Sequence, residues 1–216
     1  MQELFLKHPI CAILRNVPLE LTVPYAKAVL HGGIKLFEVA LNSSDGFAQI
    51  EILRKTFGDE IMVGAGTVLS PAQARAARAA GAQFIFTPAV QQETLRYCCQ
   101  SDLPILPGVM TPTDVAQCLS FGISTMKLFP AGTLGEGYIK NLKGPFHTTH
   151  YVAVGGVTRD NLPDFLRQGF LGVGMGSALI PKTYIINGQW EDASKWVASL
   201  VECCNRNRAP VYAEHG

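Results

Sequence analysis

The sequence predicts an α/β fold, a single (β/α)8 TIM barrel, from two observations. Short apolar or β-branched runs recur eight times along the 216 residues, and a segment of helical character follows each run. Four helical segments lead into the next run through a glycine, in the phrases LHGGIKLFEV, RAAGAQFIFT, LSFGISTMKLF and LRQGFLGVGMG. A strand–helix unit repeated in this way indicates parallel strands joined by crossover helices.

The predicted strands contain few polar residues, which is typical of parallel strands covered on both faces. They are expected at residues 10–14, 36–41, 61–65, 84–87, 105–106, 125–129, 151–154 and 172–175. The alternative is an open doubly wound sheet, which usually needs only five or six strands. The GAGT segment at 64–67 also lacks the third glycine of the dinucleotide fingerprint. Eight units therefore favour the closed barrel.

Capping residues, proline and glycine mark the helix boundaries. Cap residues or proline occupy the expected first turns at 70–71, 111–112 and 158–161. Glycines stand where four helices should end, at Gly33, Gly81, Gly122 and Gly169. No linker divides the chain, so residues 1–216 are predicted as one domain, with the polar residues 205–216 as a frayed tail.

Charge and composition limit the expected partners. The 18 Lys and Arg nearly balance the 17 Asp and Glu, so no nucleic-acid or membrane partner is expected. The N-terminal segment lacks a signal-peptide pattern, and a cytoplasmic protein is expected. The six cysteines show no CxxC spacing and are expected to be reduced packing residues. His147 and His150 fall before the seventh strand, on the face opposite the site, so no metal site is predicted.

Polar residues gather where the predicted strands end. A TIM barrel holds its active site at the carboxyl ends of its strands, so these residues are the candidates for function. They come from six different strands: Arg15, Glu38, Asn42, Thr67, Thr87, Lys127 and Ser177.

Lys127 and Glu38 lie inside otherwise apolar strands, TMKLF and LFEVAL. Burial lowers the pKa of a lysine and raises that of a glutamate, which suits an amine nucleophile and a general acid and base. The structural alternative is a snorkelling lysine or a buried ion pair between the two. The residues alone leave both readings open.

Two glycine clusters follow the last two strands, at Gly155-Gly156 and at 174–177. Barrels commonly bind phosphate at this place through backbone N–H groups. Tight turns that need glycine are the alternative. The occurrence of both clusters at neighbouring strands favours a phosphate site.

Eight motifs in barrel order resemble those of the bacterial KDPG/KHG aldolases: AILR at 12–15, FEVALNS at 37–43, VGAGTV at 63–68, FTP at 86–88, LPG at 106–108, KLFPA at 127–131, AVGGV at 153–157 and GMGS at 174–177. The resemblance covers residues 10–201. It implies a Schiff-base aldolase without a cofactor, forming homotrimers. The implied substrate is a phosphorylated 2-keto-3-deoxy sugar acid, cleaved to pyruvate and glyceraldehyde 3-phosphate.

The same resemblance implies a role for individual residues. Lys127 corresponds to the Schiff-base lysine, and Glu38 to the proton shuttle. The implied substrate-binding residues are Arg15, Asn42, Thr67, Thr87, Pro88, Phe129, Gly155, Gly156 and Ser177, with Thr67 at the pyruvyl part and the last three at the phosphate.

One departure concerns the substrate. The gluconate-type enzymes carry an arginine four residues after the strand-two glutamate, whereas Asn42 stands at that position here. An asparagine cannot grip a carboxylate as the arginine fork does, and the ALNS pattern resembles the galactonate branch. The gluconate and hydroxyoxoglutarate activities remain alternatives. Two further rivals are a phosphate-binding isomerase or epimerase that does not use its lysine covalently, and a non-catalytic sugar-phosphate binder.

Overall fold

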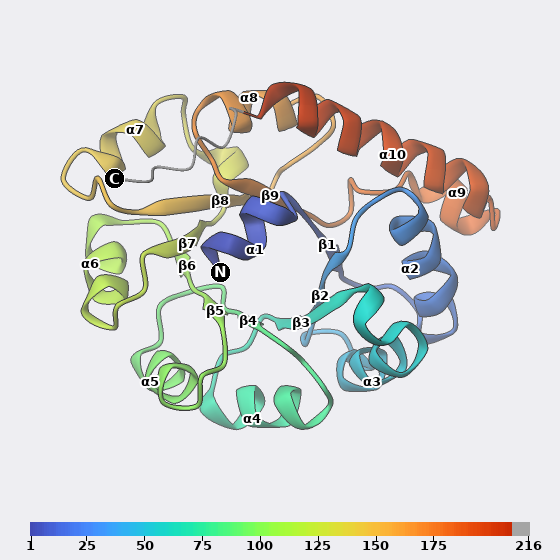
Figure 1. Ribbon diagram of the computed structural model, residues 1–216, viewed down its shortest axis with the longest axis horizontal. Helices are drawn as coiled ribbons and strands as arrows, with labels where there is room; N and C mark the ends of the chain where they lie inside the picture. Colours follow the sequence, from blue (N-terminus) through green and yellow to red (C-terminus); the bar gives the residue numbers. More distant parts are fainter. Residues whose placement is uncertain (209–216) are drawn as a thin grey trace.

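The computed structural model describes residues 1–208, in which a ring of parallel strands is surrounded by helices (Figure 1). The sheet order is β5-β4-β3-β2-β1-β9-β8-β7-β6, and every pairing is parallel. The strands of this part of the chain are β1 (Ile10–Leu14), β2 (Leu36–Ala40), β3 (Met62–Gly66), β4 (Ile85–Phe86), β5 (Ile105–Leu106), β6 (Gly108–Val109), β7 (Thr125–Leu128), β8 (His150–Val154) and β9 (Gly172–Met175).

Helices lie outside the ring; most connect successive strands, as expected for parallel connections, and the last two follow β9. They are α2 (Thr22–His31), α3 (Gly46–Phe57), α4 (Pro71–Ala79), α5 (Gln92–Gln100), α6 (Pro112–Ser120), α7 (Tyr138–Lys143), α8 (Leu162–Arg167), α9 (Lys182–Ile186) and α10 (Trp190–Asn207), with short 3-10 turns at η1 (Leu19–Leu21), η2 (Gly58–Glu60) and η3 (Ala131–Thr133). The predicted barrel is confirmed.

The fifth barrel strand is divided by Pro107. β5 pairs with β4 and β6 pairs with β7, so the ring continues through the proline. Proline has no N–H to donate to a neighbouring strand, but the Pro107 carbonyl still accepts from the Lys127 N–H at 2.9 Å. The eight predicted strands are therefore all present, and the fifth continues through Pro107 to Val109, three residues beyond its predicted end.

One helix was not predicted. α1 (Gln2–Lys7) lies across the centre of the strand ring in Figure 1. Its Phe5 is fully buried, and the Phe5 and Phe86 rings stack with centroids 6.2 Å apart. The helix thus supplies an aromatic side chain to the inside of the barrel.

The predicted boundary signals act as expected. The Ser70 hydroxyl accepts from the Gln73 N–H at 3.2 Å, and Thr111 and Asp114 form a capping box. The four glycines at the predicted helix ends all have positive φ. α10 continues to Asn207, so residues 205–207 are helical rather than part of a tail, and residues 209–216 lie outside the described part of the chain.

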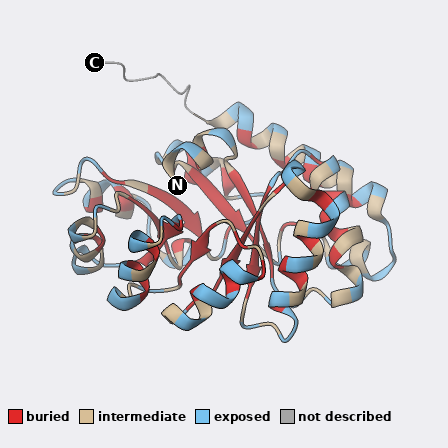
Figure 2. Cartoon of the chain, turned by 60° about the horizontal axis from the view of Figure 1, so that its bottom comes forward, coloured by how far each residue is buried: buried red, intermediate tan, exposed pale blue. Residues whose placement is uncertain are grey.

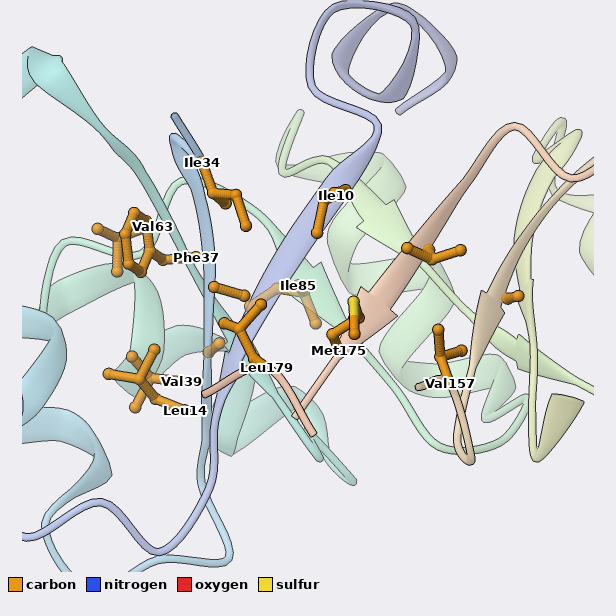
Figure 3. Packing of buried hydrophobic residues seen from close by; sticks show 14 of the residues in the cluster. Ile10, Leu14, Ile34, Phe37, Val39, Val63, Ile85, Val157, Met175 and Leu179 are labelled. Atoms are coloured by element: carbon orange, nitrogen blue, oxygen red, sulfur yellow. The ribbon is translucent and has the colours of Figure 1, made fainter. Parts of the chain in front are cut away.

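The strands are almost entirely buried, whereas most of the helices are buried on one side and exposed on the other (Figure 2). The larger apolar cluster fills the space between strands and helices, and Figure 3 shows part of it, including Ile10, Phe37 and Met175. A smaller cluster, which includes Ile13, Phe86 and Val152, fills the inside of the barrel. All six cysteines are free. Across residues 1–208 no helix has the length and apolar character needed to span a bilayer.

Candidate active site

Glu38 on β2 and Lys127 on β7 both project into the barrel. Alternate residues of a strand face the same side, and Ile13 and Val152, which stand in register with the two, belong to the interior cluster. The Lys127 Nζ lies 5.7 Å from the centroid of the Phe86 ring, another interior residue. The barrel therefore encloses an amine and a carboxyl group contributed by strands far apart in the sequence.

The Lys127 side chain is only 4% exposed. Its Nζ is also 5.4 Å from the Phe129 ring centroid. Burial lowers the pKa of Lys127, and nearby Arg15 lowers it further, while the Glu38 charge opposes both effects. The neutral amine is therefore present at a lower pH than in an ordinary lysine.

Glu38 is 1% exposed, and its Oε2 is buried without a hydrogen-bond partner in the described residues. Burial raises the pKa of the Glu38 carboxyl, and the positive charges of Lys127 and Arg15 act against this rise. Within residues 1–208, none of the ion pairs joins Glu38 to Lys127. The buried-ion-pair alternative is thus not the observed arrangement, and both groups are left available for chemistry.

Gly66 creates the space that the Glu38 carboxyl occupies. A methyl group at Gly66 would stand 1.5 Å from the Glu38 Oε1, far inside van der Waals contact. Gly66→Ala is therefore expected to displace the carboxyl or the strand, with a loss of about 1–3 kcal/mol in the free energy of unfolding.

Because the displaced carboxyl would no longer face the same atoms, we also expect kcat of Gly66→Ala to fall by about 10². Steady-state kinetics and denaturant unfolding measure the two effects. Gly135→Ala is the matched control, since a methyl group there would meet nothing within 4 Å. Wild-type kinetics in Gly66→Ala would contradict the importance of this contact.

A cavity of about 310 Å³ opens at the carboxyl ends of β1, β8 and β9. The predicted residues that line it are Arg15, Phe129, Gly155, Gly156 and Ser177. Both glycines have positive φ, at +88° and +76°, a backbone conformation that favours glycine. Since the Phe129 ring also lies beside the Lys127 Nζ, the cavity adjoins the buried amine.

Four predicted residues follow β2, β3 and β4 and are not among those that line this cavity. Asn42 is exposed, and Thr67, a β-branched residue, adopts a left-handed φ of +58°. The Thr87 hydroxyl donates to the Ala89 carbonyl at 2.7 Å and accepts from the Gly108 N–H at 3.4 Å. That hydroxyl is therefore engaged within the protein. The carbonyl of Pro88 packs against Gly108, leaving no space for a Cβ there.

Two polar residues that line the cavity, Asn16 and Thr158, were not predicted as site residues. Asn16 has a left-handed φ of +56°, and its N–H donates to the Ser43 hydroxyl at 3.3 Å. Thr158 lines the cavity beyond Gly156. An asparagine next to a strand-end arginine is a signal that could have been used, since Asn tolerates this conformation. His150 begins β8, at the end of the strand away from the cavity, and in the described residues no group of three His, Cys, Asp or Glu side chains could hold a metal ion.

Comparisons with known proteins agree with this architecture. A model of the KDPG and KHG aldolases matches residues 1–196. The 2-dehydro-3-deoxy-6-phosphogalactonate aldolase of Escherichia coli (strain K12) is 36% identical over 197 residues, which are 91% of this chain and 96% of that protein. The 2-dehydro-3-deoxy-phosphogluconate aldolase of Treponema pallidum (strain Nichols) is 33% identical over 173 residues, which are 80% of this chain and 82% of that protein.

A solved structure matches over nearly the whole fold. It is a crystal structure of KDPG aldolase from Legionella pneumophila with pyruvate captured at low pH as a covalent carbinolamine intermediate. Its TM-score is 0.85 at 30% sequence identity, and the match covers 92% of this chain and 97% of that chain. Fold, site and relatives define a barrel enzyme of the aldolase class, a carbon–carbon lyase. The chain belongs to the KDPG and KHG aldolase family.

Proposed function

We propose that this enzyme is a Schiff-base aldolase that cleaves 2-dehydro-3-deoxy-6-phosphogalactonate to pyruvate and glyceraldehyde 3-phosphate. The observation that carries the proposal is the amine of Lys127, buried inside the barrel without an ion pair in the described residues. Burial lowers the pKa of this amine and so favours its neutral form, which is the form that attacks a ketone. The covalent carbinolamine in the Legionella pneumophila relative supports the same chemistry.

In the proposed reaction, the Lys127 amine adds to the C2 ketone, and loss of water from the carbinolamine leaves an iminium. The iminium accepts the electron pair of the C3–C4 bond as the C4 hydroxyl loses its proton to Glu38, through a water molecule. The aldehyde then departs. Glu38 returns a proton to C3 of the enamine, and water releases pyruvate and the free amine. The steps need no metal or organic cofactor.

The cavity beside Phe129 would hold the phosphate of the substrate. Its glycines offer backbone N–H groups, and Arg15 and Ser177 stand at its rim. Holding the phosphate away from the bond that breaks would orient C2 toward Lys127. Thr67 is proposed to contact the pyruvyl part at the opposite side of the barrel mouth.

Trapping with borohydride tests the Schiff base. After incubation with pyruvate and borohydride, we expect one reduced pyruvyl group on the intact protein, mapped to the peptide that contains Lys127. Lys140→Met, which removes an exposed lysine, should be trapped like wild type. Absence of an adduct would instead favour the isomerase or epimerase reading, in which Lys127 acts only through its charge.

The choice of the galactonate substrate is based on Asn42. The Escherichia coli 2-dehydro-3-deoxy-6-phosphogalactonate aldolase, at 36% identity, supports this choice. We expect kcat/KM for the galacto epimer to exceed that for the gluco epimer, because Asn42 replaces the arginine of gluconate-type enzymes. Coupled assays with the two epimers measure this ratio. A ratio of one or below would favour the gluconate or hydroxyoxoglutarate alternatives. Asn42→Arg should move the ratio toward the gluco epimer.

The family resemblance further implies a homotrimer, and a cytoplasmic location is proposed from the sequence. Sedimentation velocity of the purified protein tests the assembly. A monomer or dimer at micromolar concentration would contradict the trimer.

A further inference from the structure

We infer that Asn161 is a positioning residue that orients the backbone N–H groups of the phosphate loop, defined here as residues 155–158. This inference deepens the proposed function and rests on its assignment of the phosphate to this loop. Asn161 does not line the phosphate cavity, and its influence would pass through the backbone of the loop.

The Asn161 side chain holds the loop by both of its polar atoms. Its Nδ2 donates to the Gly156 carbonyl at 2.8 Å, and its Oδ1 accepts from the Thr158 N–H at 2.8 Å. The backbone of Asn161 in turn donates to the Thr158 hydroxyl at 3.4 Å, and the residue stands at the start of α8. One side chain therefore fixes two peptide groups of the loop from the helix side.

A second bond fixes the preceding peptide. The Gly132 N–H, at the end of the KLFPAG segment, donates to the Gly155 carbonyl at 2.8 Å. The two glycine backbones are packed so closely that a methyl group at Gly132 would lie 2.8 Å from the Gly156 Cα. The turn η3, which follows the strand that carries Lys127, and the loop proposed to bind phosphate are thus joined directly.

These two bonds decide where the loop N–H groups point. The only cis peptide among the described residues is Phe129-Pro130, so the loop peptides are trans and each carbonyl is antiparallel to the next N–H. With the Gly155 and Gly156 carbonyls directed at Gly132 and Asn161, the N–H groups of Gly156 and Val157 point the other way. Neither N–H donates to another group in residues 1–208, and both residues line the cavity.

If the Asn161 bond to Gly156 were lost, the Gly156-Val157 peptide could rotate, because glycine restricts its backbone little. The Val157 N–H would then no longer be held toward an anion. Loss of one such hydrogen bond corresponds to about a tenfold change in affinity.

Two variants separate the bond to the Gly156 carbonyl from the bond to the Thr158 N–H. Asn161→Ala removes both side-chain bonds. Asn161→Asp keeps an oxygen for the Thr158 N–H and is a good helix cap, but it has no N–H for the Gly156 carbonyl. Asp160→Asn, at an exposed neighbouring position, is the control. It measures how strongly one negative charge on this turn changes the affinity for phosphate.

Calorimetry measures the dissociation constant of inorganic phosphate. Steady-state kinetics give KM and kcat for cleavage of 2-dehydro-3-deoxy-6-phosphogalactonate. A third assay follows the exchange of the C3 protons of pyruvate with deuterium. Pyruvate exchange uses Lys127 and Glu38 but no phosphate. In both Asn161 variants we expect the phosphate dissociation constant and KM to rise about tenfold. Pyruvate exchange should stay within about twofold of wild type, since no contact to the reacting carbons is removed.

Wild-type phosphate affinity in Asn161→Asp, after correction by the control, would show that the bond to the Gly156 carbonyl does not control phosphate binding and would overturn the inference. A parallel fall of pyruvate exchange and cleavage would also overturn it, because that pattern indicates a general loss of structure. A wild-type protein that binds phosphate but does not cleave the aldol contradicts the proposed function. In that case phosphate calorimetry on the Asn161 variants still tests the inference, because phosphate binding requires no turnover.

Discussion

Lys127→Met is expected to abolish aldol cleavage and to stabilise the fold at the same time. Without the amine no iminium forms, and kcat should fall by at least about 10⁴. Methionine has a similar length and no charge to bury, whereas wild-type Lys127 is 4% exposed and lacks an ion pair in the described residues. We expect a gain of about 0.5–2 kcal/mol in the free energy of unfolding, or about 2–4 °C in Tm per kcal/mol.

The stability gained by Lys127→Met should decrease as the pH rises. Burial lowers the pKa of Lys127 in the folded protein below the ordinary 10.5. Between the lowered pKa and 10.5 the unfolded chain binds more protons than the folded one, so the wild-type protein becomes more stable as the pH rises. Lys127→Met lacks this dependence. Its advantage over wild type should be largest below the lowered pKa and should disappear as the pH approaches 10.5.

Urea unfolding across a pH series measures this difference, and the pyruvate–borohydride adduct is followed on the same samples. Lys140→Met, at an exposed lysine, is the control and should change neither activity nor the pH profile. Retained cleavage in Lys127→Met would remove the Schiff base from the proposal. A stability difference independent of pH would mean that Lys127 carries an ordinary pKa.

The features that the sequence made predictable are those encoded by local pattern. Apolar runs, cap residues and glycines at helix ends specify the order of strands and helices, and strand ends then identify Lys127 and Glu38 as neighbours in space. The division of the fifth strand at Pro107 was also encoded locally, because proline cannot donate to a ladder. The fifth strand was nevertheless predicted to end at residue 106.

The features that were not predicted from the sequence depend on contacts between distant segments. α1 contains a single fully buried residue, Phe5, and only the closed barrel gives that side chain a place to pack. The fit of Gly66 to the Glu38 carboxyl requires two paired strands in a fixed register. The Asn161 bond to Gly156 joins residues five apart across a turn, and residue type alone does not reveal which carbonyl the amide holds.

Glu38→Gln is expected to separate iminium formation from the later proton transfers. Glutamine keeps the shape of the side chain beside Gly66 but cannot accept the C4 hydroxyl proton or return one to C3. We therefore expect kcat to fall by about 10²–10⁴ and pyruvate exchange to fall with it. The final yield of borohydride adduct at Lys127 should persist, in contrast to Lys127→Met.

The stability of Glu38→Gln supplies an independent check, because its pH dependence has the opposite sign. Burial raises the pKa of Glu38 above 4.5, so between 4.5 and the raised value the folded protein binds more protons than the unfolded chain. Wild-type stability consequently falls as the pH rises through this window, while glutamine stays neutral. The variant's advantage should therefore grow with pH, where that of Lys127→Met shrinks. Parallel profiles of stability against pH for the two variants would contradict the assignment of one buried acid and one buried base. The control is Glu136→Gln, at an exposed glutamate, and its stability should follow neither profile.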